Sequence, residues 1–150
     1  MNFFSTTTFI DAVNNIQSYS KFYSCFGNEF NSELLKKINS SSRVSIFTSG
    51  DKEIYKARLK NCNGRGKSYG FRVIFLIDKI NNTTYFLYAY PKYGKLGQDD
   101  ITDSFRNDLV KELKNDLAQS NTHMINIKKG YISFTQVTNK SIELVNDEEE

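Results

Sequence analysis

The segment IYKARLKNCNGRGKSYGFRVIFLI, residues 54–77, is the main basis for the fold that we expect for this chain. In its first third, Lys56, Arg58 and Lys60 alternate with apolar residues. A period of two is typical of a strand, so the three cations share one face and the apolar side chains point to the core. A Gly-rich basic loop then leads into the apolar run 71–77, which predicts the next strand.

Four strand candidates, two of them within this segment, follow one another and are separated by turn-forming or Gly-rich segments. They cover residues 44–48, 54–60, 71–77 and 84–90. Such a series predicts an antiparallel meander. Near the start of the chain, Phe3 and Phe4 allow a short first strand.

Helical spacing of apolar residues predicts helices at 8–18 and at about 28–38, before the strands. Another helix is predicted from Thr102 or Asp103 onward, and a hairpin within 124–137. We therefore expect an α+β fold in which two N-terminal helices pack on a small, mainly antiparallel sheet of four to five strands. A C-terminal helix and a short extension should follow.

The length of 150 residues fits one domain, which we expect at 1–120, with an extension at 121–150 that ends in the acidic run NDEEE. Such a run is expected to stay solvated or to fold back over a basic surface. The two cysteines lack disulfide or metal-ligand spacing, and no apolar run reaches the ~18 residues of a membrane span. A reducing, cytoplasmic location is therefore expected.

Positive charge is concentrated in the middle of the chain. Residues 51–100 carry ten Lys or Arg against five Asp or Glu, whereas residues 101–150 carry six against nine. Such a block suggests a site for a polyanion, and the alternative is a solvated sheet face.

Several kinds of catalytic site are disfavoured by the spacing of their residues. The loop GRGKS at 64–68 resembles the end of a phosphate-binding loop, but Asn61 stands where the first glycine is needed and a strand follows in place of a helix. The glycines also miss the dinucleotide-binding spacing. The single His123 has no companion for metal binding or acid–base work, and most carboxylates lie on the outer face of a predicted helix.

A basic surface with tyrosines at its edge is the candidate that is left. If the strands form a meander, Arg72 and the turn 90–95 come near the cation row of 56–60. Lysine and arginine bind phosphates, and aromatic rings stack on splayed bases, a combination expected for single-stranded RNA or DNA. The alternative to nucleic-acid binding is that the cations form a solvated strand face and that the tyrosines only pack against the rest of the fold.

The order of these elements, together with YKARLK, GRGKSYGFRVIFLI and TYFLYAYPK, resembles the RelE/HigB-like toxins of the ParE/RelE superfamily over residues 3–118. The resemblance implies a type II toxin that cleaves mRNA in the ribosomal A site, without metal or other cofactor, and that a cognate antitoxin protein neutralises. In the RelE branch the substrate 2′-hydroxyl attacks the adjacent phosphate. The residues that it implies as catalytic are Lys56, Arg58, Lys60, Arg72, Lys92 and Tyr93, and as RNA-binding Arg65, Lys67, Tyr88, Tyr90 and Lys95.

One departure from the family pattern concerns the general base. Arg58 stands where the RelE branch often has the lysine proposed as base, and a guanidinium does not deprotonate at usable pH. No histidine or acidic residue replaces this lysine in the sequence pattern, so the alternatives are that Lys56 or Lys60 takes the role of base, or that the ribosome supplies part of the chemistry. The alternative function is that of the ParE branch, which inhibits DNA gyrase without cutting nucleic acid, or that of a degenerate relative that only binds RNA.

Overall fold

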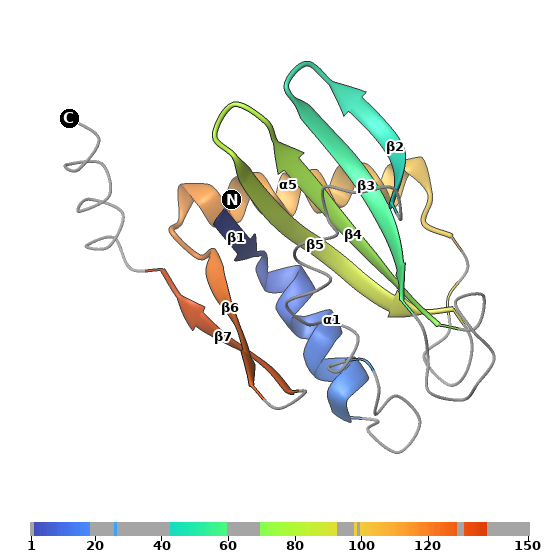
Figure 1. Cartoon of the computed structure of the whole chain (residues 1–150). Coiled ribbons are helices and arrows are strands. Elements are labelled where there is room, and N and C mark those ends of the chain that lie inside the picture. Colours follow the sequence, from blue (N-terminus) through green and yellow to red (C-terminus); the bar gives the residue numbers. More distant parts are fainter. Residues whose placement is uncertain are drawn as a thin grey trace.

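The computed structural model describes residues 2–18, 26, 43–59, 70–92, 98, 100–128 and 131–137. Figure 1 shows their arrangement as a sheet with a helix on either face. The helices and strands are β1 (Asn2–Ser5), α1 (Thr7–Ser18), β2 (Arg43–Ser49), β3 (Lys52–Leu59), β4 (Phe71–Asp78), β5 (Thr83–Pro91), α5 (Asp103–Ala118), β6 (His123–Lys128) and β7 (Tyr131–Gln136). None of the helices within these residues is long and apolar enough to cross a membrane.

Strands β2 to β5 form the antiparallel meander that the sequence predicts, each within a few residues of its expected bounds. The third predicted helix is confirmed as α5, which begins at Asp103 with Thr102 as its N-cap. The helix expected at about 28–38 and the acidic end at 138–150 lie outside the described residues, so both stay predictions.

The expected sheet of four to five strands is wrong. The described residues form a seven-stranded mixed sheet in the order β2-β3-β4-β5-β1-β6-β7. The short strand β1 precedes α1 and pairs in parallel with β5, and β6 pairs antiparallel with β1, so the C-terminal hairpin continues the same sheet. Four residues carry no periodicity from which a partner strand about 80 residues away in sequence could be identified, and parallel pairing needs a long crossover.

The central strands β4 and β5 are buried on both faces because α1 and α5 cover opposite sides of the sheet (Figure 1). On one side, Phe9 and Val13 of α1 pack with Phe75 and Phe86. On the other, leucines of α5 pack with side chains of β3, β4 and β5. That second cluster contains Leu109, Leu113, Ile54, Ile74, Leu76, Leu87 and Tyr90. All eight residues of β4 are buried, as expected for a strand covered on both faces.

Two contacts fix where the helices begin. The Thr102 hydroxyl accepts a hydrogen bond from the Phe105 backbone N–H at 3.1 Å, which starts α5 directly after the loop that carries Asp100. The buried carboxylate of Asp116, near the end of α5, accepts hydrogen bonds from the Thr7 backbone N–H at 2.8 Å and from its hydroxyl at 3.1 Å. The start of α1 is therefore tied to α5.

Candidate functional site

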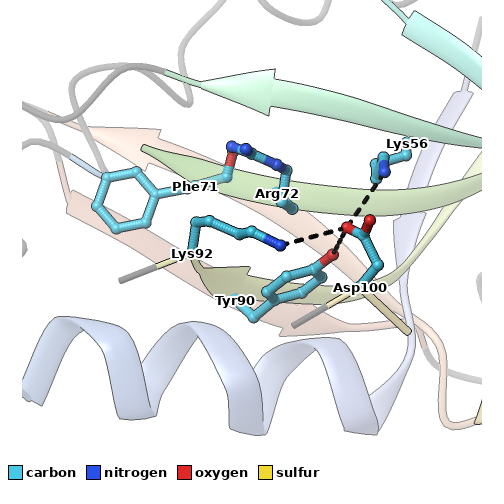
Figure 2. A network of polar contacts seen from close by, with 6 residues as sticks. All are labelled: Lys56, Phe71, Arg72, Tyr90, Lys92 and Asp100. Carbon is cyan, nitrogen blue, oxygen red and sulfur yellow. Dashed lines mark hydrogen bonds and ion pairs between the residues drawn. The ribbon is translucent and has the colours of Figure 1, made fainter. Parts of the chain in front are cut away.

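Three polar groups, one from β3 and two from the end of β5, converge on one carboxylate oxygen (Figure 2). Asp100 Oδ1 lies 3.3 Å from Lys56 Nζ and 3.7 Å from Lys92 Nζ, and it accepts a hydrogen bond from the Tyr90 hydroxyl at 3.5 Å. The side chain of Asp100 is 64 % exposed, whereas that of Lys56 is 15 % exposed. Asp100 is therefore accessible to solvent, whereas the lysine beneath it is mostly buried. We call Lys56, Tyr90, Lys92 and Asp100 the Asp100 cluster.

Strand register brings these side chains to one face. Lys56 lies opposite Ile74, and Arg72 lies between Arg58 on β3 and Tyr90 on β5. Directly opposed residues in antiparallel strands point to the same face. Lys92 follows β5, and its backbone N–H binds the Gly70 carbonyl at 3.0 Å, which places it beside the start of β4.

A β-bulge decides that two tyrosines belong to this face. The register between β4 and β5 shifts between Ile74 and Phe75, so that Ile74 opposes Tyr88 while Phe75 opposes Phe86. Beyond the bulge, Tyr90 and Tyr88 therefore pack with the α5 cluster, whereas Phe86 belongs to the α1 cluster. Without the extra residue, strict alternation would place all three on the same face.

Arg58 and Arg72 are opposed like charges beside the Asp100 cluster. Arg72 is only 4 % exposed and donates a hydrogen bond from Nη1 to the Phe71 carbonyl at 3.3 Å, toward which Figure 2 shows it turned. Arg58 is exposed. Like charges directly opposite each other destabilise a sheet, so their presence favours a role in binding an anion.

The environment shifts two pKa values in the Asp100 cluster in opposite directions. The hydrogen bond from Lys56, with the charges of Lys56 and Lys92, holds the pKa of Asp100 below its usual value despite partial burial. Burial, and then the negative charge of Asp100, raises the pKa of Tyr90 to about 12. At neutral pH the cluster therefore holds an ionised carboxylate and a neutral phenol.

Two open hollows in the surface flank Asp100. One, of about 240 Å³, reaches from Lys56 to the first turn of α5 and is lined by Ile46, Lys56, Asp100, Ile101, Thr102, Asp103 and Arg106. The other, of about 370 Å³, lies on the β5 side and is lined by Tyr88, Gln98, Asp100, Ile101, Thr102 and Phe105. Asp100 is thus shared by two hollows at the start of α5.

The structure brings together only part of the site that the sequence predicts. Lys56, Tyr90 and Lys92 belong to the Asp100 cluster, with Arg72, Arg58 and Tyr88 beside it. The other predicted residues lie outside the described part of the chain; they are Lys60, Arg65, Lys67, Tyr93 and Lys95.

Sequence reasoning missed Asp100 and Gln98. The signal that could have found them is the run Gln98-Asp99-Asp100, which stands between the basic turn and the N-cap of a helix.

His123 lies on β6 opposite Ser5, and its Nδ1 is 2.9 Å from the Asn121 carbonyl oxygen. Among the described residues, no three His, Cys, Asp or Glu side chains gather in a way that could hold a metal ion.

Comparison of the chain with protein-family models, with curated proteins and with solved structures finds no match in any of the three.

Proposed function

We propose that the chain binds RNA at the Asp100 cluster and cleaves it through the 2′-hydroxyl of the substrate, as the ribosome-dependent mRNA endoribonuclease of a type II toxin–antitoxin system. The observation that carries the proposal is the convergence of Lys56 and Lys92 on one exposed carboxylate, beside Arg72 and Tyr90. Two ammonium groups at this spacing suit the oxygens of a phosphodiester. The start of α5 adds a positive potential.

The chemistry requires a base, a stabilised phosphorane and an acid. The 2′-oxygen bonds to phosphorus while the bond from phosphorus to the 5′-oxygen breaks, giving a 2′,3′-cyclic phosphate and a 5′-hydroxyl. Asp100, ionised at neutral pH, accepts the 2′-hydroxyl proton, and one of the paired lysines donates a proton to the leaving 5′-oxygen. The remaining cations stabilise the charge of the phosphorane.

In this proposal Asp100 takes the role of general base that Arg58 cannot fill. Arg58 is a poor base, and Lys56 is engaged in an ion pair with Asp100. A carboxylate is a weaker base than a neutral lysine, but it is deprotonated throughout the physiological range. In this proposal Lys56 is a phosphate-binding cation and a proton donor.

The biological setting of the proposal comes from the resemblance to RelE/HigB-like toxins. It includes the ribosome and mRNA as binding partners, a cognate antitoxin as inhibitor and a cytoplasmic location, where translating ribosomes are found. The basic middle third of the chain supports the choice of a polyanionic partner.

Product analysis on ribosome-bound mRNA tests the proposal. The wild-type protein should leave 2′,3′-cyclic phosphate and 5′-hydroxyl ends, and a Lys56→Ala, Lys92→Ala variant should lose this activity. Lys79→Ala and Lys111→Ala form the matched double control, because both lysines are exposed and neither belongs to the cluster. Intact mRNA with the wild-type protein would overturn the proposal, and inhibited supercoiling by DNA gyrase in the same preparation would assign the ParE-like alternative.

A further inference from the structure

A separate hollow lies beneath the second half of α5, outside the Asp100 cluster. It measures about 510 Å³ and is enclosed by strands β2 to β5 on one side and by the helix on the other. This volume falls within the ~300–1,000 Å³ typical of small-molecule sites. The hollow shares no residue with the Asp100 cluster, so its role is independent of the one proposed there.

Strand register builds the floor of this hollow from one row of apolar side chains. Ile54 of β3 lies opposite Phe47 of β2 and opposite Leu76 of β4. Leu76 in turn lies opposite Tyr85 of β5. Directly opposed residues point to the same face, so these four side chains cross the sheet side by side, and we call them the Ile54 row. The helix supplies the apolar roof with Val110, Leu113 and Leu117.

The apolar lining is ordered but incompletely covered. Phe47 is 42 % exposed and Leu117 is 46 % exposed, so an apolar ligand in the hollow would remove both from water. The guanidinium carbon of Arg106 lies 4.4 Å from the centre of the Phe47 ring. The Tyr85 ring stacks on Phe4, with centroids 6.0 Å apart. Walls that are held in place before a ligand arrives lose less conformational entropy on binding.

The polar part of the lining favours an anionic head group. Lys52 and Lys114 line the hollow, and within the described part of the chain neither forms an ion pair. Asp78 is the one carboxylate of the lining, and it accepts hydrogen bonds from the backbone N–H and side-chain Nδ2 of Asn81 at 3.2 and 2.8 Å. Burial, and then the charge of Asp78, raises the pKa of Tyr85, so its phenol is a neutral donor.

We infer that this hollow binds a small amphipathic carboxylate, whose aliphatic chain lies between the Ile54 row and α5 and whose head group is bound by Lys52 and Lys114. Two lysines against one aspartate give the lining a net positive charge, which matches an anion and repels a cation. The apolar floor and roof match an aliphatic chain. The inference goes beyond the proposed function and stands without it.

Calorimetric titration with straight-chain carboxylates tests the inference. Hexanoate, octanoate and decanoate should each bind at one site per chain, with a negative heat-capacity change from burial of apolar surface. Each added methylene should tighten binding by about fourfold. Octanol has the same chain without the charge, and it should bind about fivefold more weakly than octanoate.

Two matched pairs of variants place the ligand in the hollow. Leu117→Ser should weaken binding of all these ligands by about tenfold, whereas Ile80→Ser, at a 72 % exposed position outside the hollow, should not. The double variant of Lys52→Gln and Lys114→Gln should bind octanoate no more tightly than octanol. Its control combines two changes on exposed lysines elsewhere, Lys79→Gln and Lys111→Gln. Exposed positions are chosen because their variants should fold.

The remaining outcomes overturn the inference. Absence of saturable binding excludes the ligand class, and equal affinity for octanoate and octanol excludes the ionic contact. Unchanged affinity in Leu117→Ser places the ligand outside the hollow. Self-association of the ligand-free protein that Leu117→Ser abolishes would assign the hollow to a second copy of the chain. The Lys56→Ala, Lys92→Ala variant should bind octanoate as the wild type does, which keeps this test separate from that of the nuclease.

Discussion

Lys56 and Asp100 are 44 residues apart in sequence, yet Lys56 Nζ and Asp100 Oδ1 lie 3.3 Å apart. This ion pair occupies a lysine that the proposed function assigns to a phosphate. Asp100 is therefore both a candidate base and an internal anion that competes with RNA for the same cation.

Asp100→Asn should separate these two roles. Loss of the competing negative charge should tighten RNA binding, while loss of the base should lower the cleavage rate by about 10²–10⁴-fold. Binding and single-turnover cleavage are measured on the same RNA. Asp108→Asn makes the same change of charge at an exposed position of α5 and should alter neither quantity. A cleavage rate equal to that of wild type would show that Asp100 is not the base.

RNA affinity should depend steeply on salt, and the slope should identify the phosphate contacts. For single strands, the logarithm of the association constant falls by ~0.7 per neutralised phosphate for each unit of log salt. Lys56→Ala and Lys92→Ala should each reduce the slope by about this amount. Lys79→Ala should leave it unchanged, because that lysine lies in the turn after β4. Identical slopes in all three variants would mean that the Asp100 cluster does not hold phosphate.

The pH dependence of stability should report the Asp100 ion pairs. The hydrogen bond from Lys56 lowers the pKa of Asp100 in the folded protein below the usual 3.8. Its contribution to stability is therefore fully present above that value and is lost as pH falls through the lower, folded pKa. We expect the difference in unfolding midpoint between wild type and Asp100→Asn to be constant from pH 5 to 7. Both of these pH values lie above the pKa of ~3.9 of a free Asp, so the carboxyl group is ionised in the folded and the unfolded chain. The difference should change only below pH ~4, and a change centred near neutrality would contradict the assignment.

Stability should depend strongly on the link between the two helices. Asp116→Ala removes the acceptor for the Thr7 backbone N–H and hydroxyl, and it leaves these partly buried donors without that partner. Loss of a charged acceptor at a helix N-terminus costs about 2–3 kcal/mol of unfolding free energy. Denaturant unfolding should show a lower midpoint with an unchanged slope.

Two further variants serve as controls for Asp116→Ala. Asp108→Ala lies on the exposed side of the same helix and should change the unfolding free energy by no more than ~0.5 kcal/mol. Asp116→Asn keeps one carbonyl oxygen as acceptor. Its decrease in unfolding free energy should therefore lie between those of Asp116→Ala and Asp108→Ala. Equal stability of Asp116→Ala and Asp108→Ala would show that the Thr7 contact does not stabilise the fold.

Patterns among residues close in sequence predict those strands and helices that depend on local interactions. Alternation along 54–60 and the apolar run 71–77 predict β3 and β4, because a strand buried on one face or on both leaves that pattern. Thr102 before an amphipathic stripe predicts the start of α5, because a side-chain oxygen there satisfies an unpaired backbone N–H. The same alternation predicts that Lys56, Arg58 and Lys60 share one face of their strand.

The remaining features depend on contacts between segments that are distant in sequence. The four residues of β1 pair with β5 through contacts distant in sequence, which extends the meander into a seven-stranded mixed sheet. One extra residue at the β-bulge turns Tyr88 and Tyr90 to the face of Lys56, against simple alternation. Asp100 reaches Lys56 of β3 and Lys92 after β5 because it lies just before α5, which packs against these strands. A one-dimensional pattern carries no record of such contacts, since each depends on the positions of two segments at once.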